Sequence, residues 1–121
     1  MPDSGIGTLV FLDEHEPEYS ATPTDADRAV RGRPEQRTWH HFTSQDEKFF
    51  AGYWEADPGC WKIRYTENEF CQVLAGESIL RDSEGNERRV KAGDNFVIPA
   101  GFEGEWDVIE TTRKIYVIYE P

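Results

Sequence analysis

The stretch Gly93-Asp94-Asn95-Phe96-Val97-Ile98-Pro99-Ala100-Gly101 decides the fold. It is a short apolar segment between two turn signals, with a glycine at each end. Pro99 has no N–H to give to a sheet ladder, so it marks the end of a strand. Gly93 and Gly101 provide the backbone freedom that sharp corners need. The pattern predicts a turn, a strand and a second turn, a unit that closes a small β-barrel.

Strand-like runs bounded by turn residues recur at short intervals from Thr38 onward. We predict strands at residues 48–55, 60–66, 69–74, 78–81, 87–90, 95–98, 105–109 and 114–119. Many short strands with regular turns and no helical segment are typical of a sandwich or closed barrel. Aromatic residues, which favour pleated and half-buried surfaces, make up 13% of the 121 residues. The sequence therefore predicts an all-β fold with one core.

The N-terminal part differs from the rest of the chain in composition and in residue pattern. Residues 13–36 are polar and acidic and show no helical or strand period, which predicts a loop or arm. Upstream, Thr8-Leu9-Val10-Phe11-Leu12 could form an isolated strand, and a lone strand must pair with something, such as a neighbouring subunit. We therefore divide the chain into an arm (residues 1–36) with one strand that can be swapped, and a barrel (residues 37–121). The unpaired strand favours a homodimer.

The charge balance excludes several classes of partner. Thirteen basic residues against 24 acidic ones give a formal net charge of -11, which repels nucleic acid and anionic membranes and favours solubility. No apolar run approaches the roughly 20 residues of a membrane span. The apolar segment at residues 6–12 is short and lacks the basic leader of a secretory signal. We expect a cytoplasmic protein whose two cysteines, Cys60 and Cys71, are free thiols.

Alternation in one strand predicts which side chains face the interior. In Cys60-Trp61-Lys62-Ile63-Arg64-Tyr65 the larger apolar residues alternate with basic ones. A period of two places the three aromatic and aliphatic side chains inside the barrel and the two basic ones in solvent. Glu69 opens the next strand, and by the same parity it shares a face with Cys71.

Several motifs follow one another in a characteristic order: Gly52-Tyr53-Trp54-Glu55, Asp57-Pro58-Gly59, the run from Tyr65 to Gly76, the Gly93-to-Gly101 stretch, Gly104-Glu105-Trp106 and Arg113-Lys114-Ile115-Tyr116. Together they resemble the cupin superfamily. In particular they resemble its small single-domain branch related to ureidoglycine aminohydrolase and to the ethanolamine-utilisation cupin. The resemblance spans residues 52–119. It implies a cupin double-stranded β-helix, or jelly-roll barrel, in which two sheets close around a central pocket.

The same resemblance implies a metal site that this sequence lacks. Most metal-binding cupins hold a divalent transition metal with His-x-His, a Glu and a later His. Here the carboxylate is kept as Glu69, whereas the imidazole positions fall on Ile63, Tyr65 and Gly104. We therefore predict no metal ligand and no cofactor. The alternative left open is a divalent transition metal bound through Glu69.

The three histidines, His15, His40 and His41, lie outside these motifs. His40 and His41 are adjacent in a strand-like stretch, so their rings should point to opposite faces and cannot chelate one ion together. We interpret them as surface or rim residues. The alternative is that one of them reaches into the barrel mouth and acts as a base.

Two residues are the candidate catalytic groups. Inside an aromatic barrel, Glu69 would be a proton acceptor or the partner of a cation; its other role would be to accept hydrogen bonds at a strand start. Tyr65 could donate a phenolic proton, or simply fill the core. Cys71 is a weaker candidate as a nucleophile, and Glu55 and Lys114 would polarise the pocket rim. The predicted ligand-binding residues are Trp54, Trp61, Ile63, Tyr65, Glu69, Cys71 and Trp106.

Three functions are consistent with this pattern. The leading one is a metal-free cupin that binds a small molecule, with cationic ligands favoured by Glu69 and the aromatic faces. The second, suggested by the resemblance to ureidoglycine aminohydrolase, is an enzyme that acts on a small nitrogen-containing or carbonyl metabolite. In that case Glu69 would be the general base and Tyr65 the acid. The third is a non-catalytic subunit that serves as a scaffold, because the fold alone does not select a function.

Overall fold

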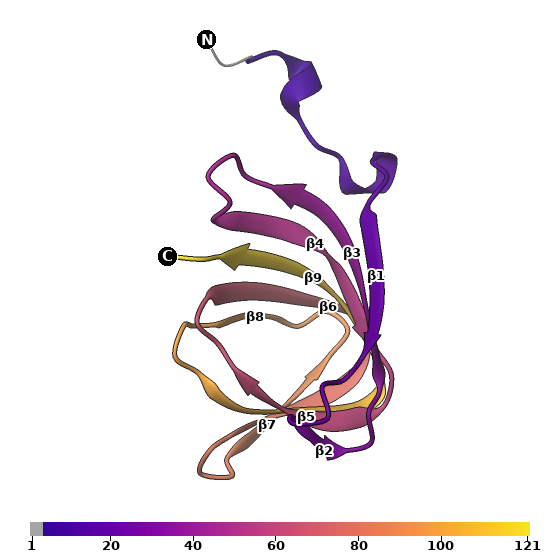
Figure 1. Cartoon of the computed structure of the whole chain (residues 1–121), viewed down its shortest axis with the longest axis vertical. Helices are drawn as coiled ribbons and strands as arrows, with labels where there is room; N and C mark the ends of the chain where they lie inside the picture. The colour runs from indigo at the N-terminus through magenta and orange to yellow at the C-terminus, as the bar shows by residue number, and fades with distance from the viewer. Residues whose placement is uncertain (1–3) are drawn as a thin grey trace.

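The computed structural model describes residues 4–121, and most of them lie in β-strands. The strands are β1 (Glu18–Pro23), β2 (Ala29–Arg31), β3 (Glu35–Thr43), β4 (Phe49–Ala56), β5 (Gly59–Arg64), β6 (Asn68–Asp82), β7 (Glu87–Lys91), β8 (Asn95–Ile98) and β9 (Glu103–Tyr119). Two single-turn 3-10 helices, η1 (Ile6–Thr8) and η2 (Leu12–Glu14), come before them. The strands curl into a barrel, and the N-terminal segment extends away from it (Figure 1). Within residues 4–121, no helix has the length and apolar character needed to cross a membrane.

Two long strands organise the barrel. β6 and β9 pair with each other in antiparallel fashion along most of their length. The first half of β9 pairs with β5 and the second half with β4, while β6 pairs with β8 and then with β7. All nine strands belong to one continuous hydrogen-bonded sheet. It bends so that the strands β1-β3-β4-β9-β6-β8 and β2-β5-β9-β6-β7 form the two sheets of the barrel, which share the long strands. This arrangement confirms the predicted all-β jelly roll.

The bend that separates the two sheets lies at Gly76. Here φ is +83°, and a Cβ atom would collide with the carbonyl oxygen of Thr111 on β9. The β6–β9 register shifts around this point, as expected of a bulge. The prediction of separate strands at residues 69–74 and 78–81, and at residues 105–109 and 114–119, is therefore wrong. Each pair is one strand: in β6 the glycine bends the strand instead of ending it, and in β9 the polar residues 110–113 continue the strand.

The N-terminal prediction needs two corrections. Residues 13–36 are not only loop, because they contain β1 and β2. Every residue of β1 is exposed, so no buried face produces the alternation by which strands are recognised. The expected strand at residues 8–12 is wrong, because this segment holds parts of the two 3-10 turns. β3 begins at Glu35, so the proposed boundary at residue 36 falls inside a strand. Exchange of the arm between subunits stays a prediction.

The stretch from Gly93 to Gly101 is confirmed as turn, strand and turn. β8 covers Asn95–Ile98, and φ is +96° at Gly93 and +97° at Gly101. The second turn holds the chain after β5, because the Gly101 N–H donates to the carbonyl oxygen of Tyr65 at 2.7 Å. β8 also pairs Ile98 with Glu69. The segment that closes the barrel thus fixes the backbone at both predicted catalytic positions.

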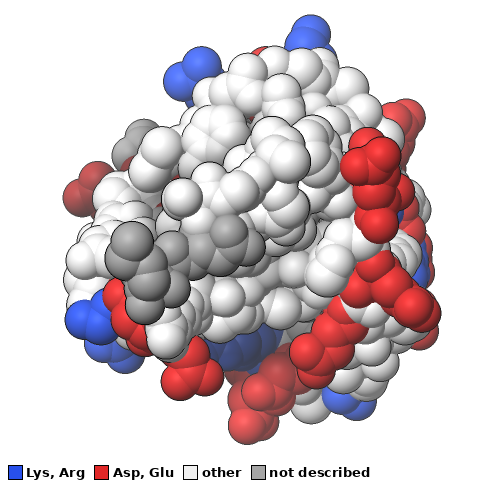
Figure 2. Space-filling model, turned by 90° about the horizontal axis from the view of Figure 1, so that it is seen from above, with Lys and Arg blue, Asp and Glu red and all other residues white. Residues whose placement is uncertain are grey.

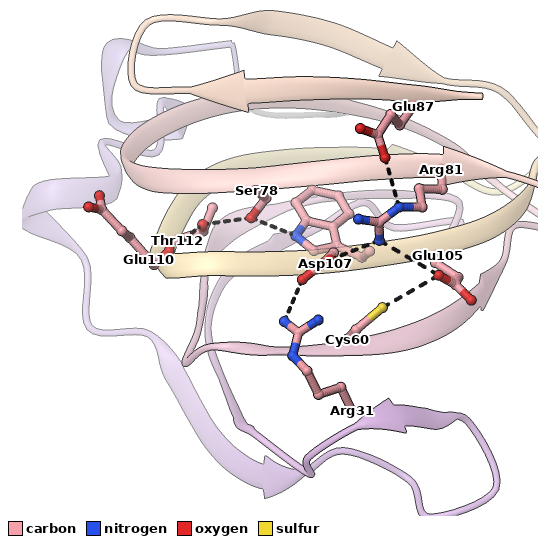
Figure 3. Close-up of polar contacts among 10 residues, drawn as sticks. Arg31, Cys60, Ser78, Arg81, Glu87, Glu105, Asp107, Glu110 and Thr112 are labelled. Atoms are coloured by element: carbon pink, nitrogen blue, oxygen red, sulfur yellow. Dashed lines mark hydrogen bonds and ion pairs between the residues drawn. The ribbon is translucent and has the colours of Figure 1, made fainter. Parts of the chain in front are cut away.

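A polar cluster fastens β2 to the barrel. The guanidinium groups of Arg31 on β2 and Arg81 on β6 contact opposite oxygens of Asp107 on β9, at 2.5 and 2.8 Å (Figure 3). The hydrogen bond from Arg31 holds the pKa of Asp107 below its ordinary value, although burial opposes this shift. Three strands that are distant in sequence are therefore tied at one buried carboxylate.

Apart from Glu69 and Asp107, the acidic side chains of residues 4–121 are exposed or half-buried. On the face seen in Figure 2, Asp and Glu side chains gather along one side, and the middle carries uncharged residues. The core, in contrast, is built from Ala56, Trp61, Cys71, Ile98, Trp106 and Val108. Both cysteines are buried and free, which confirms the prediction of unpaired thiols.

Candidate ligand-binding pocket

A cavity of about 400 Å³ lies inside the barrel. Strands β3, β4, β5, β6 and β9 and the residue after β5 supply its walls. The lining residues are Gln36, Thr38, His40, Phe50, Trp54, Trp61, Ile63, Tyr65, Glu69, Trp106, Lys114, Tyr116 and Ile118. Aromatic and aliphatic side chains predominate, and a few polar groups converge among them.

Most of the predicted ligand-binding residues meet in this cavity. Six of the seven line it, and the exception is Cys71. Cys71 is fully buried on the same face as Glu69, as the parity predicted, but it packs behind Lys114, with its Sγ atom 3.7 Å from the Nζ atom. Lys62 and Arg64, between the inward-facing residues of β5, are exposed as expected.

Glu69 and Lys114 form a buried ion pair in the pocket. The Nζ atom of Lys114 lies 2.8 Å from Oε2 of Glu69, and the two residues are 4% and 5% exposed. The same Nζ atom lies 4.6 Å from the ring centroid of Trp54 and 4.3 Å from that of Trp106. The expectation that Lys114 lies at the rim is thereby corrected: it is buried beside Glu69.

The protonatable groups around this pair keep their protons at neutral pH. Burial is the largest single influence on Lys114 and lowers its pKa, but the interactions with Glu69 and Cys71 together outweigh it, and the pKa of Lys114 lies above its usual value. Burial, assisted by the charge of Glu69, raises the pKa of Tyr65 well above 10 and that of Tyr116 to about 12. Burial likewise raises the pKa of the Cys71 thiol to about 12. The pocket therefore holds an ammonium group and two neutral phenols, of which Tyr65 hydrogen-bonds to Glu69 and Tyr116 to His40.

A histidine joins the opposite wall. The Nδ1 atom of His40 lies 2.7 Å from the hydroxyl of Tyr116, and its Nε2 atom lies 2.6 Å from the hydroxyl of Thr43, which is exposed. His41 points to the other face of the sheet, where its ring packs against Tyr53 with 5.5 Å between centroids. The prediction of opposite faces is confirmed. Of the two, it is His40 that reaches the barrel interior.

The sequence analysis missed several pocket residues on β3 and β9. Gln36, Thr38 and His40 alternate along β3, and Tyr116 and Ile118 follow Lys114 with the same period on β9. The alternation that identified the inner face of β5 would have placed these residues too. On β3 the signal was present, but the polar character of Gln36 and Thr38 concealed it. Phe50 also lines the pocket from β4.

Glu55 does not belong to the pocket. Its carboxylate faces the outside of the barrel, where it pairs with the guanidinium of Arg37 at 2.8 Å. Arg113 lies 3.9 Å from its other oxygen. The expectation that Glu55 polarises the pocket rim is therefore wrong.

The residues present do not fit the divalent metal that the resemblance implies. In the described part of the chain, residues 4–121, no group of three or more His, Cys, Asp and Glu side chains could hold a metal ion. A side chain cannot replace Gly104, because its Cβ atom would collide with the carbonyl oxygen of Arg81. The carboxylate of Glu69 already carries an ammonium group, whose charge repels a second cation. This site is not a metal centre of the usual cupin kind.

Solved structures share this fold at low sequence identity. The EutQ protein of Clostridium difficile is 21% identical with a TM-score of 0.64, over 72% of this chain and 64% of that one. A Pseudomonas syringae protein of unknown function is 20% identical with a TM-score of 0.75, over 84% of this chain and 43% of that one. A Thermotoga maritima protein described as a predicted oxalate decarboxylase is 19% identical with a TM-score of 0.65, over 93% and 99% of the two chains.

This chain therefore spans less than two thirds of the first two of these proteins. None of the curated proteins compared with it matches. At these identities the structural likeness establishes the fold alone. The sequence itself matches the EutQ-like cupin domain family over residues 43–116, which is more than half of its length. The chain belongs to the EutQ-like cupin family.

Proposed function

We propose that this protein binds a small organic molecule in the barrel pocket and does so without a metal. The observation that carries the proposal is the pocket itself, a hollow of about 400 Å³ with aromatic walls and a few convergent polar groups. Cavities of this size and character are the usual sites for small ligands. The ion pair of Glu69 and Lys114 supplies charge inside the hollow and leaves no net charge to be balanced by an ion.

The walls favour a ligand that is both flat and polar. Trp54, Trp61 and Trp106 offer apolar faces for a planar group. Tyr65, Tyr116 and His40 offer hydrogen bonds at fixed positions. A scaffold that needed only a packed core would have no use for such a hollow beside a buried ion pair, because unfilled space costs stability.

A thermal-shift screen of small planar metabolites, run after treatment with a chelator, tests this proposal. A ligand present well above its Kd raises Tm, because it binds only the folded state. Thr38→Trp fills the cavity from β3 and should abolish the shift. Val97→Trp places the same side chain at a position that is 60% exposed, outside the barrel, and should leave the shift intact. Failure of every compound to stabilise the wild type, or equal responses of the two variants, would contradict the proposal.

A second candidate function is catalysis on a small nitrogen-containing or carbonyl metabolite, with Glu69 as general base and Tyr65 as acid. One observation favours it: the chain Thr43–His40–Tyr116 links an exposed hydroxyl to the pocket interior and could carry a proton. Any ligand from the screen should then be turned over slowly by the wild type. Glu69→Gln should remove turnover and retain binding. If product forms equally in both, Glu69 is not the base.

A further inference from the structure

We propose that Lys114 is the pocket's own cation and the anchor for a carbonyl or carboxylate oxygen of the ligand. Its ammonium group takes the place against Glu69 that an external cation would otherwise occupy. This inference rests on the proposed binding function and names the class of ligand. It replaces the cationic ligand that Glu69 and the tryptophans suggested from the sequence alone.

The surroundings of the ammonium group are those of a cation site. The carboxylate of Glu69 lies 2.8 Å from it. The rings of Trp54 and Trp106 lie 4.6 and 4.3 Å away, within the range of cation–π attraction. A carboxylate with two tryptophan faces is the combination that binds alkylammonium groups. Because Lys114 fills it from within the chain, a cationic ligand meets repulsion here.

The hydrogen-bonding capacity of Lys114 is not exhausted. An ammonium group has three N–H donors. Among the described residues, Glu69 supplies the one oxygen acceptor within bonding distance, and the other partner is the Cys71 sulfur at 3.7 Å, a weak acceptor. Lys114 also lines the cavity. A ligand oxygen that reaches it would therefore make a charge-assisted hydrogen bond that no other group in the pocket makes.

The neighbouring phenols are neutral, so they add no negative charge that would repel an acceptor oxygen from Lys114. Tyr65 and Tyr116 line the same cavity as Lys114 and retain their protons at neutral pH. Planar apolar surface is available beside them on Trp61 and Trp54. The matching ligand is a planar molecule with a carbonyl or carboxylate oxygen at one end.

Three matched probes test this by isothermal titration calorimetry: benzoate, benzamide and benzylamine, which share a ring and differ in the polar end. Wild type should bind benzoate and benzamide and reject benzylamine. Lys114→Met keeps the length of the side chain and removes its charge, so affinity for benzoate should fall by about tenfold to a hundredfold. Lys62→Met, on the exposed face of β5, is the matched control and should change nothing.

Lys114→Ala should invert the preference. It leaves the carboxylate of Glu69 and the faces of Trp54 and Trp106 open to the cavity, so benzylamine should now bind and benzoate should not. A merely structural lysine would produce no such inversion. Glu69→Gln combined with Lys114→Met removes both charges, and this double variant should fold and bind neither charged probe well.

The outcomes separate the two proposals. If wild type binds benzylamine as tightly as benzoate, if Lys114→Met leaves benzoate affinity unchanged, or if no probe binds any variant, the inference about Lys114 is overturned. Metabolite binding in the thermal-shift screen would still stand in each case. If Thr38→Trp leaves probe binding intact, the pocket is not the binding site and the proposed function itself fails.

Discussion

Two buried carboxylates in this barrel, Asp107 and Glu69, differ in their cationic partners and in their surroundings: Tyr65 and Cys71 also hydrogen-bond to Glu69. Asp107 has a guanidinium group on each of its oxygens, from Arg31 and Arg81 (Figure 3). Glu69 has one ammonium partner, Lys114, and both members of that pair border a cavity of about 400 Å³. The two residues are similarly buried, at 3% and 5% exposure.

This difference distinguishes an ion cluster that stabilises the fold, around Asp107, from an ion pair that can bind a ligand, Glu69 with Lys114. A buried charge is stable only when its partners satisfy it, and removing one partner exposes the cost of burial. Around Asp107 the partners come from three strands and leave no capacity for a ligand. Lys114, in contrast, keeps unused N–H donors and borders the cavity. An ammonium group that has unused hydrogen-bond donors and borders a cavity is the feature that points to function here.

The largest loss of stability is expected from Gly104→Ala, a substitution at the end of the barrel that contains Asp107. The added Cβ atom would collide with the carbonyl oxygen of Arg81, so β6 and β9 must separate locally. The free energy of unfolding should fall by about 3 kcal/mol or more. Urea denaturation measures it. At Gly7 nothing lies within 4 Å of a new Cβ atom, so Gly7→Ala is the control, and equal stability of the two variants would contradict the account.

The next effect is the loss of the Asp107 cluster. Asp107→Asn leaves two arginines without their shared anion and should cost about 2 kcal/mol at neutral pH. This is less than for a fully enclosed pair, because the Arg31 side chain is 56% exposed and can be rehydrated. Benzoate binding should not change. A loss of binding with intact folding would show that the two regions are not separate.

The pH dependence of this variant follows from the lowered pKa of Asp107. A carboxyl group whose pKa is lower in the folded state stabilises the fold above its unfolded pKa, which is about 3.9, and ceases to do so as pH falls through the folded value. The stability difference between wild type and Asp107→Asn should therefore be full at neutral pH and shrink below about pH 4. Denaturation curves from pH 7 to pH 2 measure it. A difference that stays constant over this range would contradict the assignment.

A smaller effect is expected at Trp106, which lies against Lys114 and is hydrogen-bonded to Ser78. Its indole N–H donates to the hydroxyl of Ser78 at 3.1 Å, and its face lies under the ammonium of Lys114. Trp106→Phe should cost about 1 kcal/mol of stability and weaken benzoate binding a few-fold. Ser78→Ala removes this hydrogen bond and the one between Ser78 and Thr112 but keeps the indole ring, so it should reduce stability and leave binding unchanged. If Trp106→Phe and Ser78→Ala changed the affinity for benzoate equally, the indole face would not contribute to the binding site.

The smallest effect is expected for alkylation of the two cysteine thiols in the folded protein. Burial raises the pKa of Cys60 to about 11 and that of Cys71 to about 12, so little thiolate exists at pH 8. The folded protein should react with iodoacetamide only through unfolding, and both cysteines should react quickly in urea. Mass spectrometry of timed samples measures this. Rapid labelling of Cys71 in the folded state would show that the barrel interior near Lys114 is open to reagents.

Local patterns in the sequence predicted the elements that have one buried face or a turn with special backbone needs. The Gly93-to-Gly101 stretch and the alternation in β5 are of this kind, and they located the pocket. β1 was missed because all its residues are exposed. β6 was divided because a glycine such as Gly76 marks both bends and turns, and β9 was divided at its polar residues 110–113. The pairing of Glu69 with Lys114 depends on strand register between segments 45 residues apart. No local pattern contains that register.

The protonation state of Lys114 tests the central claim most directly. A nitrogen-15 NMR titration of the Lys114 Nζ atom, assigned by comparison with Lys114→Met, follows it in the wild type. The account predicts a protected ammonium signal that persists above pH 10.5, because Glu69 raises the pKa of Lys114. An amine that loses its proton near neutral pH would contradict the account, since the pocket would then hold no cation of its own.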